Sequence, residues 1–269
     1  MKKIITLLML SLILATSVFA SGTKEKTGDN SLKKVQEKGV FILGLDDAFP
    51  PMGYRNDKNE IVGYDIDLAK EVTTRMGLEL KLQPIDWNSK EQELATGNID
   101  CIWNGFTKSP AREKVMSFTD TYVMNKQVLI VKSNSPLKTL DDFEGKTIGL
   151  QGGSTASDAM DASPDFKNSL KQVIEFKDNL TALMDLNAGG LDGVVLDLLV
   201  AQDTIKRSNM DFVILNAGLS EEEYAVGFRK NDIALTNAVN AQLIAMQKDG
   251  TMSSITTKWF GKDISVIGK

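Results

Sequence analysis

Short apolar runs and amphipathic stretches alternate along most of the chain. Residues 40–45 form an apolar run typical of a buried strand, and residues 66–76 carry their apolar side chains on one helical face. Residues 78–82 alternate leucine with polar side chains, which indicates a half-buried strand, and the next amphipathic stretch ends at Gly97 before an apolar run that starts at Ile99. Because strands and helices alternate in this order, we expect parallel strand pairing through right-handed crossovers.

The same alternation begins again after Tyr122 and continues to about residue 260. Further strands are expected at residues 147–150, 173–176, 193–196, 212–215 and 224–228, and further helices from about residue 156 and at residues 179–188, 198–207, 233–248 and 252–260. Two α/β units in tandem predict two lobes that face each other across a cleft, and such clefts are favoured sites for small molecules.

The composition is that of a globular protein with two domains. The 269 residues are 42% hydrophobic, which suffices for a sizeable core. The net charge is −5 and the basic residues are scattered, so we expect no nucleic-acid partner. The absence of histidine rules out Ser-His-Asp and Cys-His catalysis and His-ligated metal sites, and we expect neither a metal nor a cofactor. An enzyme would have to use carboxylates, lysine, tyrosine or the single cysteine.

The first twenty residues have the pattern of a secretory signal peptide. Two lysines near the N-terminus precede an apolar segment at residues 4–15, and Ser17-Val18-Phe19-Ala20, with small residues at its two ends, fits cleavage after Ala20. The apolar segment is too short to anchor the chain in a membrane. Ser21 stands where a bacterial lipoprotein carries its acylated cysteine, so we expect a free periplasmic protein with a flexible tether at residues 21–30.

Chemically useful residues follow several of the predicted strands, at the edge where open α/β sheets bind ligands. Asp46, Trp87 and Asn104 lie at such strand ends in the first unit, and Gln151 and Asp197 do so in the second. An acid in the position of Asp197 is equally well explained as the cap of the helix that follows it.

The segment after Asn104 combines three groups that suit a carboxylate. Backbone N–H groups around Gly105, the hydroxyl of Thr107 and the guanidinium of Arg112 would bind one together. Taken alone, the same segment also fits a surface loop with a solvated arginine. The loop at residues 151–155 opens a helix and suits a small carboxylate, and it lacks the pattern of a nucleotide-binding loop.

Two further observations have structural explanations. Asp65 and Asp67 lie in the first turn of a predicted helix, where we expect them to cap free N–H groups rather than to act as an acid–base pair. Cys101 lies in an apolar run with no basic partner nearby, so we expect a buried structural thiol rather than a nucleophile.

Six segments, taken in order, resemble a known family. They are G-L-D-D-A-F-P-P-M from Gly44, G-Y-D-I-D-L-A-K-E-V from Gly63, P-I-D-W from Pro84, I-D-C-I-W-N-G-F-T from Ile99 with Ala111 and Arg112 following, L-D-G-V-V-L-D from Leu191, and K-W-F-G from Lys258. The chain resembles the periplasmic solute-binding proteins of the polar amino-acid class, bacterial extracellular solute-binding protein family 3, which serve ABC importers.

This resemblance implies an α/β fold of the two-lobed periplasmic-binding-protein type II. Each lobe would be a mostly parallel sheet flanked by helices, and two crossover strands would form the hinge. The first lobe would comprise residues 31–121 and 224–269, and the second lobe residues 126–218. The lobes would close on a ligand by a hinge motion.

The resemblance also implies how the two charges of an amino acid are bound. Arg112 corresponds to the arginine that clamps the α-carboxylate, assisted by Thr107, Thr155 and the backbone around Gly105. Asp197 corresponds to the acid that accepts the α-ammonium. A ligand held in this way favours the closed state, because its two charged groups bind opposite lobes.

The remaining pocket positions concern the ligand's side chain. Phe49 and Trp87 correspond to aromatic walls on either side of it, Asp46 and Asn104 line the first-lobe pocket, and Gln151 occupies a second-lobe position whose identity varies in the family. An acid beside two aromatic rings suits a cationic or hydrogen-bonding side chain. We therefore expect arginine, lysine or another polar amino acid, with cystine as an open alternative.

The expected partners are an amino acid and the membrane permease of an ABC importer, and the protein is expected to be a monomer without stable membrane insertion. We expect no catalysis. The main alternative is an enzyme on the same scaffold, a dehydratase of cyclohexadienyl type with a cleft carboxylate as general acid. A third class, the extracellular sensor of a kinase or channel, requires a transmembrane segment, and none is evident after residue 20.

Overall fold

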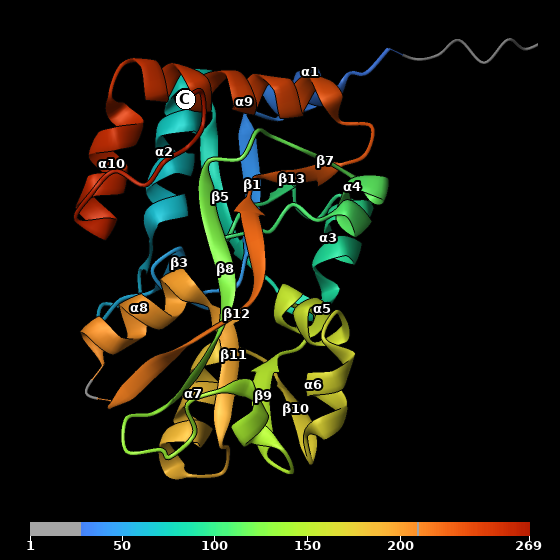
Figure 1. Cartoon of the computed structure of the whole chain (residues 1–269). Helices are drawn as coiled ribbons and strands as arrows, with labels where there is room; N and C mark the ends of the chain where they lie inside the picture. The colour runs from blue at the N-terminus through green and yellow to red at the C-terminus, as the bar shows by residue number, and fades with distance from the viewer. Residues whose placement is uncertain (1–27, 209) are drawn as a thin grey trace, which may run out of the picture.

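The structure is a computed structural model that describes residues 28–208 and 210–269, and it forms two α/β lobes joined by long strands (Figure 1). The expected signal peptide and the tether up to residue 27 lie outside the described residues. Each lobe contains a five-stranded sheet. In each sheet four strands run in one direction and one strand runs against them, so both sheets are mostly parallel.

The first lobe has the strand order β5-β1-β6-β13-β7. The parallel pairing of β1 with both β5 and β6 confirms the crossover order expected from the alternating pattern. Its strands are β1 (Val40–Leu45), β5 (Glu79–Pro84), β6 (Cys101–Ile102), β7 (Met116–Phe118) and β13 (Gly227–Arg229). The flanking helices are α1 (Ser31–Lys38), α2 (Tyr64–Met76), the short turn η1 (Trp87–Ser89), α3 (Lys90–Thr96), α4 (Pro110–Val115), α9 (Ile233–Lys248) and α10 (Thr251–Phe260).

A small antiparallel sheet adds to this lobe after β1. It consists of β2 (Ala48–Phe49), β3 (Gly53–Arg55) and β4 (Ile61–Val62). The turn between β3 and β4 includes Asn59, whose φ of 63° places it in the left-handed region that asparagine tolerates. In this sheet Phe49 of β2 pairs with Gly53 of β3.

The second lobe has the strand order β10-β9-β11-β8-β12. Its strands are β8 (Val123–Lys132), β9 (Thr147–Gln151), β10 (Gln172–Phe176), β11 (Gly193–Asp197) and β12 (Phe212–Tyr224). Its helices are η2 (Leu140–Phe143), α5 (Thr155–Asp161), α6 (Pro164–Ser169), α7 (Asn179–Ala188) and α8 (Leu198–Arg207). The bounds of α8 match the predicted helix at residues 198–207, whereas the short helices α4 and α6 carry no periodic signal in the sequence.

Strands β8 and β12 connect the lobes as an antiparallel pair (Figure 1). Their register runs from Phe212 opposite Lys132 to Tyr224 opposite Val123, with irregularities on either side of Gly218. The sequence predicted a strand only at residues 212–215 and a separate one at 224–228. That prediction was wrong, because the polar run at residues 220–223 continues the same strand before β13 begins.

The apolar side chains of the two lobes meet in a continuous core. One cluster of buried residues contains Phe41 and Leu43 of β1 together with Val128 and Ile130 of β8. Cys101 lies in this cluster with no exposed surface, and burial raises the pKa of its thiol well above the ordinary value. These observations confirm the expected buried, unreactive cysteine.

The two acids at the start of α2 do not cap their own helix. Asp65 is fully buried, and its carboxylate accepts hydrogen bonds from the Gly105 N–H at 2.6 Å and the Tyr122 hydroxyl at 2.9 Å. Asp67 accepts from Lys258 Nζ at 2.6 Å and from Trp259 Nε1 at 2.8 Å. The capping interpretation was therefore wrong, and both acids instead connect α2 to distant segments.

Candidate ligand-binding cleft

Both main sheets end with polar groups where the lobes meet. β1 is followed directly by Asp46, β6 by the loop that contains Asn104 and Gly105, and the facing strands β9 and β11 end at Gln151 and Asp197. A chain that leaves a parallel strand at its carboxyl end exposes its next side chains at one edge. The sequence therefore positions these groups through strand order alone.

One enclosed space lies between these strand ends. It is lined by Phe49, Trp87, Gly105, Thr107, Arg112, Gln151, Ser154, Thr155 and Asp197. Eight of these nine residues were predicted from the sequence, and Ser154 is the addition. The cavity has a volume of only about 10 Å³, roughly the space that one water needs. The lobes must therefore separate before a molecule as large as an amino acid can enter.

The other two predicted positions, Asp46 and Asn104, lie directly behind the lining. Asn104 Oδ1 accepts a hydrogen bond from the Asp46 N–H at 3.0 Å, and Asp46 Oδ2 accepts one from Gln151 Nε2 of the opposite lobe at 2.7 Å. Burial raises the pKa of Asp46 to about 6, although the bonds from Ala48 and Gln151 oppose this shift. Asp46 is thus a carboxylate that already has one amide donor from across the cleft.

Arg112 lies at the first turns of α4, which begins after Ser109. The Ser109 hydroxyl accepts the Arg112 N–H at 3.3 Å, and Arg112 Nη1 donates to the Thr107 carbonyl at 2.9 Å. The guanidinium carbon also stands 4.4 Å from the centre of the Phe106 ring. Among the described residues no carboxylate forms an ion pair with Arg112. Burial lowers the pKa of the guanidinium, which stays charged, and most of its N–H groups remain available.

Asp197 faces Arg112 across the cavity from the end of β11. The side chain makes no cap to α8, so the helix-cap explanation left open by the sequence is wrong. Its Oδ1 accepts hydrogen bonds from Asn125 Nδ2 at 2.8 Å and from the Tyr224 hydroxyl. Because both bonds go to the same oxygen, Oδ2 can accept a further donor. Burial, followed by repulsion from Glu222, raises the pKa of Asp197 to about 8.

The loop at Gly105 depends on a backbone conformation that glycine favours. Gly105 has a φ of +54°, and a Cβ there would lie 2.9 Å from Phe49 Cε1 and 3.1 Å from Tyr224 Cε2. Its own N–H is bound by Asp65, so that donor is engaged within the first lobe. Gly105 therefore contributes to the cavity by letting the backbone approach the rings of Phe49 and Tyr224 closely.

The aromatic walls are both buried in the first lobe. Phe49 is 6% exposed and Trp87 is 8% exposed. The Trp87 ring meets Phe106 edge to face with 5.9 Å between ring centres, and Lys90 Nζ lies 5.2 Å from the Trp87 ring centre. These contacts hold the indole ring of Trp87 in one orientation.

Contacts that cross the cleft hold the lobes together. Lys90 Nζ donates to the Gly153 carbonyl at 2.8 Å, and the hydroxyls of Thr107 and Thr155 are 3.4 Å apart. Thr107 and Thr155 line the cavity, and so does Gln151, which donates to Asp46 across the cleft. The structure therefore describes a closed arrangement of the lobes.

Sequence patterns alone did not indicate several residues that support the site. Asp65 holds the Gly105 loop, and Asn125, Gln127, Glu222 and Tyr224 of the hinge strands surround Asp197. Ser154 lies in the loop at residues 151–155 that the sequence predicted to suit a small carboxylate, so its position had a signal in the sequence. Glu222 stands in a run of three glutamates, which is typical of a solvated surface, so its burial has no signal in the sequence.

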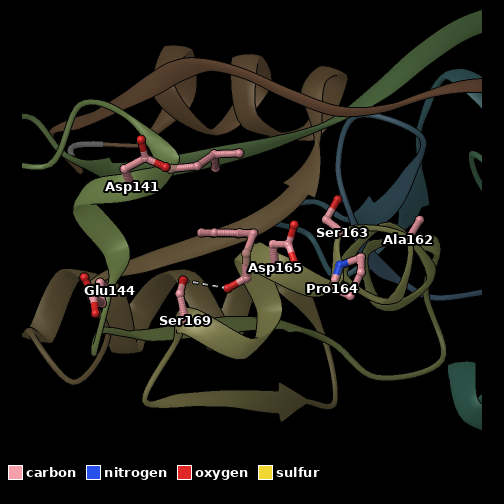
Figure 2. A pocket seen from close by; sticks show the side chains of 9 residues that line it. Asp141, Glu144, Ala162, Ser163, Pro164, Asp165 and Ser169 are labelled. Carbon is pink, nitrogen blue, oxygen red and sulfur yellow. Dashed lines mark hydrogen bonds between the residues drawn. The ribbon is translucent and has the colours of Figure 1, made fainter.

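A second hollow of about 580 Å³ lies on the second lobe, away from the cleft (Figure 2). Asp141 lies on η2 and Glu144 directly after it, whereas Asp165 lies on α6, and the three carboxylates do not converge in Figure 2. Ser169 bonds within its own helix to the Phe166 carbonyl. No group of three His, Cys, Asp or Glu side chains in residues 28–208 and 210–269 is arranged to hold a metal ion. Within the same residues, no helix combines the length and apolarity needed to cross a bilayer.

The sequence and the structure of the chain are similar to those of many known proteins. The model of the bacterial extracellular solute-binding proteins, family 3, matches residues 41–262. The L-cystine-binding protein TcyJ of Escherichia coli K12 is 29% identical, over 94% of this chain and 95% of TcyJ. A substrate-binding protein of a Streptococcus pneumoniae ABC uptake transporter, solved with bound histidine, is 36% identical with a TM-score of 0.86, over 89% of this chain and 99% of that one.

Two further solved structures bear on the range of activities. Tv2483 bound to L-arginine is 30% identical with a TM-score of 0.86, over 90% of this chain and 99% of that one. The ancestral amino-acid-binding protein AncCDT-1, a precursor of cyclohexadienyl dehydratase, is 28% identical with a TM-score of 0.79, over 86% and 99% of the two chains. The fold, the cleft between the lobes and the family match agree: the chain belongs to the bacterial extracellular solute-binding proteins, family 3.

Proposed function

We propose that the protein binds a free amino acid between its lobes and delivers it to the membrane permease of an ABC importer. The observation that carries this proposal is that Arg112 and Asp197 line one cavity from opposite lobes. The ligand's carboxylate would pair with Arg112 and its ammonium with Asp197, so neither ligand charge is buried alone. Thr107 and Thr155, which meet beside Arg112, would add hydroxyl donors to the carboxylate.

We further propose that the two lobes move about the hinge strands and that the protein acts in the periplasm. Residues 31–121 with 224–269 would move as one lobe and residues 126–218 as the other, because the chain passes between them only through the hinge strands. A ligand that binds both lobes stabilises the closed state, and this closed shape is what a permease would recognise. The mature protein would be a periplasmic monomer, released by cleavage after residue 20.

For the ligand's side chain we propose a polar or basic group. The side chain would lie between Phe49 and Trp87 and extend toward Asp46, where Gln151 now donates. A guanidinium, ammonium or amide would replace this donor and keep the buried carboxylate satisfied. An acidic side chain would instead meet the negative charge of Asp46.

A calorimetric or thermal-shift screen against the amino acids tests this function. A ligand present at 100 times its Kd stabilises the folded protein by about 2.7 kcal/mol, which is easily measured. Trp87→Ala and Asp46→Ala are expected to change the ranking of the ligands, because both residues contact the side chain and neither contacts the zwitterion. If no amino acid shifts the melting curve of the wild-type protein, the proposed function is wrong.

One observation favours a second candidate, a dehydratase acting on a prephenate-like substrate. Asp197 has a pKa raised to about 8, so it holds a proton at neutral pH, as a general acid in such an enzyme must. Incubation with prephenate or arogenate, followed by product absorbance, separates the two. Turnover that Asp197→Asn abolishes would replace the binding function, whereas unchanged substrate together with amino-acid binding would exclude the enzyme.

A further inference from the structure

We propose that Glu222 is the second acid of the ammonium site: it shares one proton with Asp197, and the ammonium of a bound amino acid displaces that proton into solvent. This inference rests on the proposed function and assigns a role to a hinge residue. It predicts that amino-acid binding releases a proton at neutral pH.

The two carboxylates are buried side by side. Glu222 is 4% exposed and Asp197 is 5% exposed. The amide nitrogen of Asn125 donates to both, at 2.8 Å to Asp197 Oδ1 and at 2.7 Å to Glu222 Oε2. One NH₂ group thus bridges the two acids, which fixes their carboxyl groups within a few ångströms of each other.

The groups around the pair are neutral donors. Gln127 Nε2 of β8 lies 3.1 Å from both oxygens of Glu222, and the Tyr224 hydroxyl of β12 donates to Asp197. From α5, the Thr155 hydroxyl is 3.5 Å from the same Gln127 nitrogen. Neither acid forms a salt bridge with any described residue.

The cation that faces the pair is Arg112 of α4, beyond hydrogen-bonding distance across the cavity. Both carboxylates act on Arg112 electrostatically, since each raises the pKa of its guanidinium against the lowering effect of burial. In the proposed complex this arginine pairs with the ligand's carboxylate. The acids are then left with the ligand's ammonium as their countercharge.

Two buried carboxylates in contact cannot both ionise without a compensating cation, so such pairs hold one proton between them. The raised pKa of Asp197, caused by burial and by Glu222, agrees with this state near neutral pH. When the ammonium arrives, it supplies the missing positive charge and the second carboxylate ionises. No covalent bond of the ligand changes, and the displaced proton passes to the buffer.

The test is calorimetry of L-arginine binding at pH 7 in two buffers with different ionisation enthalpies, which gives the number of protons released. At this pH Asp46, with a pKa of about 6, is mostly ionised and contributes little. The α-ammonium of arginine is fully protonated, so the ligand itself releases none. If arginine does not bind, the best ligand of the amino-acid screen with an equally basic ammonium replaces it.

The wild-type protein is expected to release close to one proton for each ligand bound at pH 7, and Glu222→Gln is expected to release less than half of that. Glu221→Gln is the matched control, because Glu221 precedes Glu222 on the same strand and is exposed, and it should behave as the wild type. Zero release from the wild type, or equal release from Glu222→Gln, would overturn the proposal.

A measurement without ligand separates this proposal from the proposed function. The infrared C=O band of a protonated carboxyl is expected in the free protein at pH 7.5, weaker in Glu222→Gln and unchanged in Glu221→Gln. Asp65→Asn as a background removes an acid whose pKa burial raises to about 7, so that a band remaining at pH 7.5 is assigned to Asp197 and Glu222 even if Glu222→Gln does not fold. If no amino acid binds, the proposed function is wrong, and the infrared band of the free protein still decides whether the two acids share a proton. Absence of the band would overturn the shared proton.

Discussion

At the scale of single residues, the charged groups of the cleft are held by neutral partners rather than by opposite charges. Arg112 is positioned by the Thr107 carbonyl and the Phe106 ring, and Asp197 by Asn125 and Tyr224. Such partners fix orientation without cancelling charge. Both side chains are therefore held in place without an ion pair to any described residue.

Replacement of Arg112 by alanine is expected to weaken the binding of every amino acid. The ligand's carboxylate would be buried without its cation, a loss of roughly 2–5 kcal/mol, or about thirtyfold and more in Kd. Titration calorimetry measures the loss. Lys114→Ala is the control, because Lys114 is an exposed residue of the same helix. A change of threefold or less in Arg112→Ala would show that the carboxylate binds elsewhere.

The pH dependence of stability is expected to change in Asp65→Asn. Burial raises the pKa of Asp65 to about 7, despite its bonds from Gly105 and Tyr122. A carboxyl whose pKa is higher in the folded state stabilises most below its unfolded pKa, and this stability is lost as the pH rises through 7. Denaturant unfolding between pH 4 and pH 8 should therefore show a steeper decline in the wild type than in Asp65→Asn.

The control for this experiment is Asp67→Asn, on the same helix and paired with Lys258 near the surface. Its slope with pH should follow that of the wild type over the same range. Parallel curves for the wild type and Asp65→Asn would mean that Asp65 is ionised in the folded protein throughout, with its two donors outweighing burial.

At the scale of elements, the loop from β6 to α4 determines the shape of the cleft. It turns at Gly105, is fastened to α2 by Asp65, and presents Thr107 before α4 begins. The loop is short because α4 starts with Pro110, whose fixed φ suits a first helical turn. Arg112 therefore projects from a rigid element, although its own helix is only six residues long.

Gly105→Ala is expected to destabilise the protein more than Gly97→Ala and also to weaken ligand binding. Both glycines have positive φ, so each substitution costs about 1–2 kcal/mol of backbone strain. A Cβ at Gly97 meets nothing within 4 Å, whereas one at Gly105 meets Phe49, Tyr224 and Met52. Denaturant unfolding and calorimetry of the two variants measure the difference, and equal losses would mean that the Gly105 loop adjusts freely.

At the scale of the whole molecule, the closed arrangement is held by a contact remote from the cavity. Arg207 of α8 donates to the Tyr54 hydroxyl of β3 at 2.5 Å, and its guanidinium lies 4.3 Å from the Tyr54 ring centre. Tyr54 in turn meets Trp259 of α10 edge to face. Arg207 of the second lobe thus contacts Tyr54, which packs against Trp259, at a distance from the residues that would contact a ligand.

Arg207→Ala is expected to shift the free protein toward open lobes. An exposed cation–π contact is worth about 0.5–1 kcal/mol, so all ligands should bind roughly two- to fivefold more weakly with an unchanged ranking. Small-angle scattering of the free protein should show a larger radius of gyration. Lys206→Ala, the neighbouring exposed residue of α8, serves as the control. A change in ligand ranking would indicate that Arg207 acts on the pocket itself.

Local patterns predicted much of the fold and of the cavity lining, and they failed where distant segments meet. The strand at residues 40–45 and the helices at 198–207 and 233–248 were found with those bounds, since each is one uninterrupted stretch of apolar or helix-forming sequence. The crossover strand β12 was divided in two because its middle is polar. Asp65 resembled a cap because the positions of Gly105 and Tyr122 beside it arise only in the folded chain.

The sequence by itself determined the α/β order of elements, the strand-end positions of Asp46, Gln151 and Asp197, and the family resemblance that singled out Arg112. The order of elements and the strand-end positions depend on periodicity and spacing, and the resemblance depends on six short segments, so all three come from local stretches of the chain. Only the tertiary structure decided that Glu222 is buried against Asp197, that Asp46 accepts a bond from Gln151 across the cleft, and that Arg207 docks on Tyr54. Each of these joins residues far apart in the chain, and burial and proximity of this kind exist only once the lobes have packed.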